Sequence, residues 1–111
     1  MIRYVVVLCR RSGSTREEFH QAWAEHGELV RRLPGVLAVT LNPAVEGSSV
    51  QRDDFDGIGF LDFPDVPTMD ACLASPQARA VREHTATFAD AQRAQRFVVQ
   101  VGPTLTSSYD G

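Results

Sequence analysis

One histidine in this 111-residue sequence lies where it could move a proton inside the fold. Trp23 follows Phe19 by four residues, and His26 follows Trp23 by three. These spacings place the three side chains on one face of a helix. An imidazole has an ordinary pKa near ~6.5, so it can act as a general acid or base at neutral pH. Two interpretations remain open: His26 lines a pocket and shuttles a proton, or it packs at the helix end against a backbone carbonyl.

The other two histidines have different settings. His84 precedes Phe88 by four residues, near the inner stripe of a later helical segment. It therefore either approaches the same cavity as His26 or is an exposed helix residue. His20 lies away from the apolar stripe and is expected at the surface. His26 is thus the candidate catalytic residue.

Aromatic side chains could build the wall of a pocket for a ring-shaped ligand, although core packing explains them equally well. Asp62 lies on the same face of an apolar strand as Phe60. Its carboxylate is therefore expected either at a solvent edge or in a pair, in which it could orient a histidine. A buried tyrosine hydroxyl needs a partner in any case. The expected substrate contacts are Phe19, Trp23, Tyr4, Phe60, His84 and Phe88.

Composition excludes several classes of function. A formal charge of −3 argues against a nucleic-acid partner, and no apolar run approaches the ~20 residues that span a bilayer. The N-terminus has no signal-peptide pattern, so a cytoplasmic protein is expected. The absence of lysine removes Schiff-base chemistry. The sequence has only two cysteines, and it has no metal-ligand spacing and no phosphate-binding glycine loop. We therefore expect the protein to bind no metal and no cofactor.

Strand and helix signals alternate along the chain. Thr15 and Glu18 form a capping box, and Pro34 with Gly35 ends the helix that they begin. Gly59 in the third strand indicates a close approach by another group on that face, and Pro43 indicates that the second strand lies at an edge of the sheet or has a bulge near that point. The predicted strands are 2–9, 36–45, 56–63 and 96–101, and the predicted helical segments are 15–35, 65–75 and 75–92, followed by a polar tail.

This order predicts an α+β, ferredoxin-like βαββαβ unit over residues 1–102, with a tail at 103–111. Right-handed crossovers place the helices on one face of a four-stranded antiparallel sheet. Both faces of the strands are nevertheless apolar: in the first strand, Val5 and Val7 alternate with Val6 and Leu8. An uncovered apolar face marks an interface, and a homodimer that pairs sheet against sheet satisfies it with one patch.

The sequence resembles the EthD family of the dimeric α+β barrel superfamily over roughly residues 2 to 101. The resemblance implies a ferredoxin-like protomer, a dimer in which two sheets face each other, and a small-molecule pocket between helices and sheet. Some enzymes of this kind carry a tyrosine on the second strand, where this chain has Val39 and Thr40. The residues that carry the resemblance are Thr15, Glu18, Phe19, Trp23, His26, Leu33-Pro34-Gly35 and Asp56-Gly57-Ile58.

Proteins similar to this family include lactone isomerases, cofactor-free enzymes of aromatic polyketides and accessory proteins of degradation operons. The resemblance therefore implies a cofactor-free acid/base enzyme, of the isomerase or cyclase type, on an aromatic or lactone-like metabolite. Its alternatives are a non-catalytic binding or accessory protein of an oxidative degradation pathway and a cofactor-independent monooxygenase. His26, beside Trp23 and Phe19, is the site residue that carries over.

Overall fold

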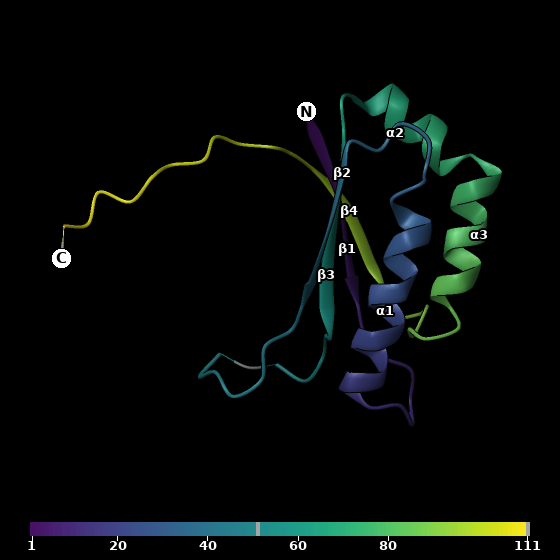
Figure 1. Ribbon diagram of the computed structural model, residues 1–111, viewed down its shortest axis with the longest axis vertical. Coiled ribbons are helices and arrows are strands. Elements are labelled where there is room, and N and C mark those ends of the chain that lie inside the picture. Colours follow the sequence, from purple (N-terminus) through teal and green to yellow (C-terminus); the bar gives the residue numbers. More distant parts are fainter. Residues whose placement is uncertain (51, 111) are drawn as a thin grey trace.

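The computed structural model describes residues 1–50 and 52–110 (Figure 1). The strands pair antiparallel in the order β2-β3-β1-β4, which confirms the predicted α+β, ferredoxin-like fold. Strand β2 is an edge strand, as Pro43 at its end indicates. The elements are β1 (Ile2–Leu8), α1 (Arg16–Val30), β2 (Ala38–Pro43), β3 (Gly57–Phe63), α2 (Val66–Leu73), α3 (Pro76–Thr85) and β4 (Gln95–Gln100).

The capping box at the start of α1 forms as predicted. The Glu18 backbone N–H donates to the Thr15 hydroxyl oxygen, and the Thr15 N–H donates to the Glu18 carboxylate, both at 3.1 Å. The helix ends at Val30, before Pro34, and the chain turns through Gly35 at a φ of +83°. A side chain at Gly35 would also lie 2.6 Å from Thr68, so glycine is required there for two reasons.

The second helical region divides into α2 and α3 and ends earlier than residue 92. Ser75 caps α3, and a proline occupies its first turn. After Thr85 the chain continues in turns, in which the N–H groups of Ala86 and Ala89 still donate to the carbonyls of Arg82 and Thr85 at 3.2 and 2.9 Å. The Asp90 N–H donates to the carbonyl of Cys9 at 2.9 Å, and Ala89 forms a β-bridge with Arg10. The two residues that follow these turns therefore pair with Cys9 and Arg10, just after β1.

All three helices cover one face of the sheet, and the C-terminal tail extends away on the other side (Figure 1). The core lies between the helices and the sheet. On the open face, the strand register places Val5 opposite Phe60 and Phe97. Phe97 is 46% exposed and Val99 42% exposed. In the part of the chain that the structure describes, no helix has the length and apolar character needed to cross a membrane.

Candidate functional site

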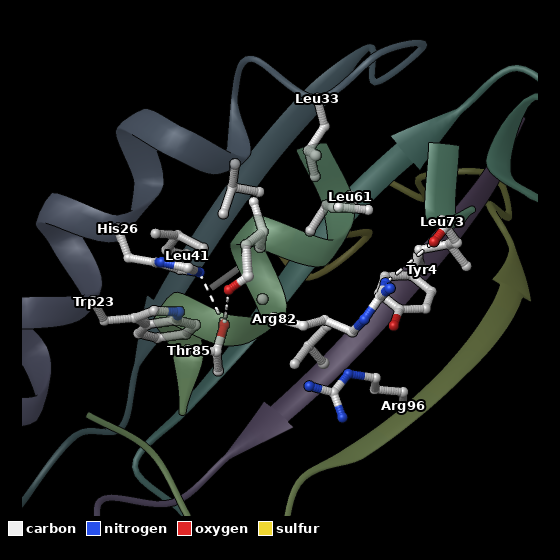
Figure 2. Close-up of a pocket in the computed structure, with 15 residues that line it drawn as sticks. Tyr4, Trp23, His26, Leu33, Leu41, Leu61, Leu73, Arg82, Thr85 and Arg96 are labelled. Carbon is white, nitrogen blue, oxygen red and sulfur yellow. Dashed lines mark hydrogen bonds between the residues drawn. The ribbon is translucent and has the colours of Figure 1, made fainter. Parts of the chain in front are cut away.

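A mostly apolar cavity lies between α1, α3 and the helix-facing side of the sheet (Figure 2). Its volume is about 60 Å³. The apolar wall comes from both layers: Val6 and Leu61 from the sheet, Val30 from α1 and Val81 from α3. The polar groups that reach it are few: Tyr4, His26, Arg82, Thr85 and Arg96.

Trp23 lies flat on the sheet because β3 carries no side chains beneath it. A Cβ atom built at Gly57 would lie 2.0 Å from the Trp23 ring, and one at Gly59 would lie 3.3 Å from it. The close approach predicted at Gly59 is therefore confirmed, and the approaching group is the indole. The two glycines let α1 sit close enough to the sheet for Trp23 and His26 to line the cavity.

His26 is buried, with 3% of its surface exposed, and both of its ring nitrogens have partners. Nδ1 lies 2.7 Å from Nδ1 of His84, and Nε2 lies 3.1 Å from the Thr85 hydroxyl oxygen. The same hydroxyl lies 2.8 Å from the carbonyl oxygen of Val81. The structure thus connects four groups in one chain of hydrogen bonds.

The carbonyl at the end of this chain fixes the direction of every proton in it. Since a carbonyl only accepts, the Thr85 hydroxyl donates to Val81 and must accept from Nε2 of His26. His26 is then the Nε2–H tautomer, whose Nδ1 carries a lone pair. His84 must donate its Nδ1 proton to that lone pair. Protons therefore point inward from His84.

Electrostatics keeps His26 in this neutral form. Burial, followed by the neighbouring His84, lowers the pKa of His26 from 6.5 to about 4. The rings of His84 and His26 are nearly parallel, with planes inclined by 6° and centroids 4.9 Å apart, as an in-plane hydrogen bond between the two Nδ1 atoms requires, and His84 is exposed. The histidine pair therefore joins a neutral, buried imidazole at the cavity wall to the protein surface.

The opposite end of the cavity is basic (Figure 2). Tyr4 from β1, Arg82 from α3 and Arg96 from β4 line it together. Burial raises the pKa of the Tyr4 hydroxyl, and the positive charges of Arg96 and Arg82 partly offset this effect. Arg82 also donates to the carbonyl of Leu73 at 3.2 Å.

The residues predicted as site residues separate into three groups. Tyr4, Trp23 and His26 line the cavity. Phe19 and Phe88 lie in the buried cluster behind it, and the Phe88 ring contacts His26 edge to face at 5.1 Å between centroids. In this arrangement they support the cavity wall.

His84 and Phe60 occupy different positions from these. His84 contacts His26 and is not part of the cavity wall. Phe60 lies on the open face of the sheet, because it alternates with Gly59 and Leu61, which face the helices. The Arg3 guanidinium lies 4.7 Å above its ring. Phe60 therefore does not line this cavity, and the expectation that it contacts a ligand there is corrected: its side chain points to the opposite face of the sheet.

Two other expectations concern polar residues outside the cavity. Asp62 is paired, as one of its two expected settings required: both of its carboxylate oxygens accept from Arg3, at 2.7 and 3.0 Å, and no histidine takes part. His20 is half-buried, with Nε2 2.8 Å from the carbonyl oxygen of Asp56. The prediction that His20 lies at the surface therefore holds only in part, because its side chain is partly covered.

A buried charge cluster that the sequence did not reveal anchors the loop before β3. Asp56 is 1% exposed and accepts from Arg16 at 2.8 Å and from the Arg10 guanidinium at 2.6 Å. Burial raises the pKa of Asp56, but these hydrogen bonds outweigh burial and hold it below its usual value. Arg16 also donates to the carbonyls of Arg52 and Phe55. None of these side chains lines the cavity, so the cluster positions the loop.

Arg82, Thr85 and Arg96 line the cavity but are not among the predicted site residues, although the spacing of apolar residues does place Thr85 on the inner stripe of the 75–92 segment. A weak signal existed for Arg96, which shares the helix-facing side of β4 with Val98 and Gln100 and is the charged member of that set. Arg82 carries no such signal, because an arginine at the edge of an apolar helix stripe is ordinarily solvated.

The model of the EthD domain matches residues 11–92 of this chain. This match covers most of the sequence, and the chain belongs to the EthD family. No curated protein matches the sequence significantly.

Solved structures of low sequence identity share the fold. A hydroxynitrile lyase from Passiflora edulis is 17% identical with a TM-score of 0.71, over 95% of this chain and 96% of that one. A dimeric ferredoxin-like protein of unknown function from Thermobifida fusca is 14% identical with a TM-score of 0.68, over 90% of each chain. SnoaB, a cofactor-independent oxygenase from Streptomyces nogalater, is 15% identical with a TM-score of 0.65, over 96% of this chain and 97% of that one.

Proposed function

We propose that this EthD family protein is a cofactor-free acid/base enzyme, of the isomerase or cyclase type, that acts on a small aromatic or lactone-like metabolite. The observation that carries the proposal is the position of His26, a neutral imidazole in an apolar cavity with its second nitrogen linked to the exposed His84. A group that holds a proton inside a cavity and exchanges it with solvent is what acid/base catalysis needs.

The ligand would take the place of Thr85 as the partner of His26 Nε2. As an acid, His26 gives its Nε2 proton to the ligand, its Nδ1 receives the Nδ1 proton of His84, and His84 takes a proton from water at its own Nε2. As a base, His26 starts from the resulting Nδ1–H tautomer: Nε2 accepts the ligand proton, Nδ1 returns its proton to His84 Nδ1, and His84 releases its Nε2 proton to water. Thr85 keeps its hydrogen bond to Val81 in both cases, and while its hydroxyl accepts from Nε2 it holds His26 in one tautomer.

The size of the cavity limits the ligand. An engineered protein cavity that binds benzene measures about 150 Å³, whereas this one measures about 60 Å³. A ring therefore enters only when side chains at the edge of the cavity move. Arg82 and Arg96 are exposed, so their guanidinium groups can move without loss of core packing. The substrate is accordingly small.

The experiment follows proton exchange at carbon, which needs no knowledge of the product. Phenylacetone and α-angelica lactone carry acidic C–H groups beside a carbonyl, and ¹H NMR in D₂O measures their exchange. The wild-type protein should accelerate exchange. The rate of exchange with His26→Gln should be about 100-fold lower, since a general acid or base contributes at least about this factor. His84→Gln should slow it as well, because it breaks the path to solvent.

His20→Gln is the matched control, since His20 bonds the Asp56 carbonyl outside the cavity. Its exchange rate should equal that of the wild type. Circular dichroism shows that each variant is folded before its rate is compared. Equal exchange rates in the wild type and folded His26→Gln would contradict the proposal. Ligand binding without exchange would instead support the non-catalytic binding protein.

A cofactor-independent oxygenase is the second candidate, and the shared fold with SnoaB favours it. Such a reaction needs the same base to form a carbanion that meets oxygen. Oxygen consumption that accompanies proton exchange would distinguish it from isomerisation.

The assembly that we propose is a homodimer through the open face of the sheet. The apolar side chains Phe97 and Val99 on that face are exposed in the single chain, and a second copy would cover them. The Thermobifida fusca protein of the same fold is dimeric, which supports this arrangement.

A further inference from the structure

Two guanidinium groups meet at one end of the apolar cavity. Arg82 comes from α3 and Arg96 from the edge strand β4, and both line the cavity next to Tyr4. Figure 2 shows them at the Tyr4 end, away from His26 and Trp23. Both charges act on the Tyr4 hydroxyl, so residues far apart in the sequence place two cations and a phenol around one point.

Neither of these arginines has an acidic partner in the described ranges, 1–50 and 52–110. The ion pairs there use other arginines: on the same helix as Arg82, for example, Arg79 pairs with Glu83 at 3.6 Å. Arg82 donates to one backbone carbonyl, of Leu73, which leaves most of its five N–H groups free. The free donors of Arg82 and Arg96 are therefore available to an anion at the cavity.

The two ends of the cavity differ in chemistry, and this difference fixes the orientation of a bound ligand. The planar guanidinium fork matches a carboxylate in geometry, and a charge-assisted hydrogen bond is about twice as strong as a neutral one. Between that end and His26 the wall is apolar, with Val6, Leu61 and Val81. A molecule that fits both ends carries an anionic group and an apolar body.

We propose that the cavity binds a small amphipathic acid, namely a ring that carries a carboxylate, with the carboxylate on Arg82 and Arg96 and the ring toward His26. This inference rests on the proposed function, because it names the substrate class of the same cavity. It also gives the two arginines a positioning role: an anchored carboxylate sets which carbon of the ring meets His26.

The test compares benzoate with benzamide, which have nearly the same shape and differ in charge. Amide chemical shifts of the ¹⁵N-labelled protein give both dissociation constants at constant ionic strength. Benzoate should shift the signals of cavity residues, including the Trp23 indole N–H, and bind about tenfold more tightly than benzamide. Arg82→Gln and Arg96→Gln should each reduce this preference, while Arg79→Gln, on the solvent side of the same helix, should retain it.

Each other outcome overturns a defined part of the account. Equal affinities for benzoate and benzamide in the cavity would refute the anionic ligand and leave the proposed function standing. An acid preference that survives in both cavity variants would refute the role of Arg82 and Arg96. Shifts confined to the open sheet face, or no binding of either probe, would refute both the inference and the proposed ligand cavity. The spectra themselves show whether each variant is folded.

Discussion

Lowering the pH from about 7 to about 4.5 should destabilise the folded protein through His26. Burial favours the neutral imidazole, so the pKa of His26 is lowered to about 4 in the folded chain, against 6.5 for an unperturbed histidine. As the pH falls, the unfolded chain therefore binds a proton first. The stability that His26 contributes is complete above pH ~6.5 and is lost as the pH approaches ~4.

The size of the effect follows from the two pKa values. Each unit of difference corresponds to about 1.4 kcal/mol, and integration between pH ~7 and ~4.5 gives a loss of roughly 2 kcal/mol. The assay is urea unfolding of the wild type and His26→Gln at both pH values. Glutamine does not titrate, and its amide can still bond Thr85 and His84. The carboxylates are common to both proteins, so the difference between the two pH dependences isolates His26.

The wild type should lose roughly 2 kcal/mol more than His26→Gln over this range. Parallel pH dependences would refute the reasoning, because they would mean that His26 titrates in the folded chain as it does in the unfolded one. Such a result would also contradict the hydrogen-bond directions deduced for His84, His26 and Thr85, because they require a neutral His26.

Four further substitutions test other parts of the structure. Asp56→Asn removes the buried carboxylate that pairs with Arg16 and leaves this buried charge only the exposed Glu46 carboxylate, 3.3 Å away, so it should cost about 3–5 kcal/mol in urea unfolding; wild-type stability would contradict this assignment. Gly57→Ala forces a Cβ atom to 2.0 Å from the Trp23 indole, whereas Gly59→Ala brings one to 3.3 Å. The first substitution should lower the unfolding free energy by about 1–3 kcal/mol, and the second should lower it by less. Equal losses would argue against the packing of Trp23 on β3. Val99→Glu places a charge on the open sheet face and should convert a dimer to a monomer in sedimentation velocity, whereas an unchanged mass would contradict the sheet-to-sheet dimer.

Local signals made the fold predictable. The Thr15–Glu18 capping box, the spacing of Phe19, Trp23 and His26, and the proline near the end of β2 each act through neighbouring residues. These signals fix helices, strands and the inner face of α1 without reference to the rest of the chain. The path of the chain after α3 was not predictable in this way, because the Asp90 N–H pairs with the carbonyl of Cys9, which is distant in the sequence.

The candidate site was predictable only in part, for the same physical reason. The apolar stripe placed His26 and Trp23 together, and strand alternation separated Phe60 from Leu61. Alternation alone does not say which face the helices cover when both faces are apolar, so Phe60 was assigned to the ligand. The pairing of His26 with His84 and the meeting of Arg82 with Arg96 depend on how α1, α3 and β4 pack.

The central claim is that a small ligand occupies the cavity in contact with His26. Intermolecular nuclear Overhauser effects test it most directly, measured with whichever of benzoate and benzamide binds more tightly. The account predicts effects between the ring protons of the ligand and both the His26 imidazole and the Trp23 indole. Effects to Phe60 or Phe97 alone would place the ligand on the open face of the sheet and would contradict the account.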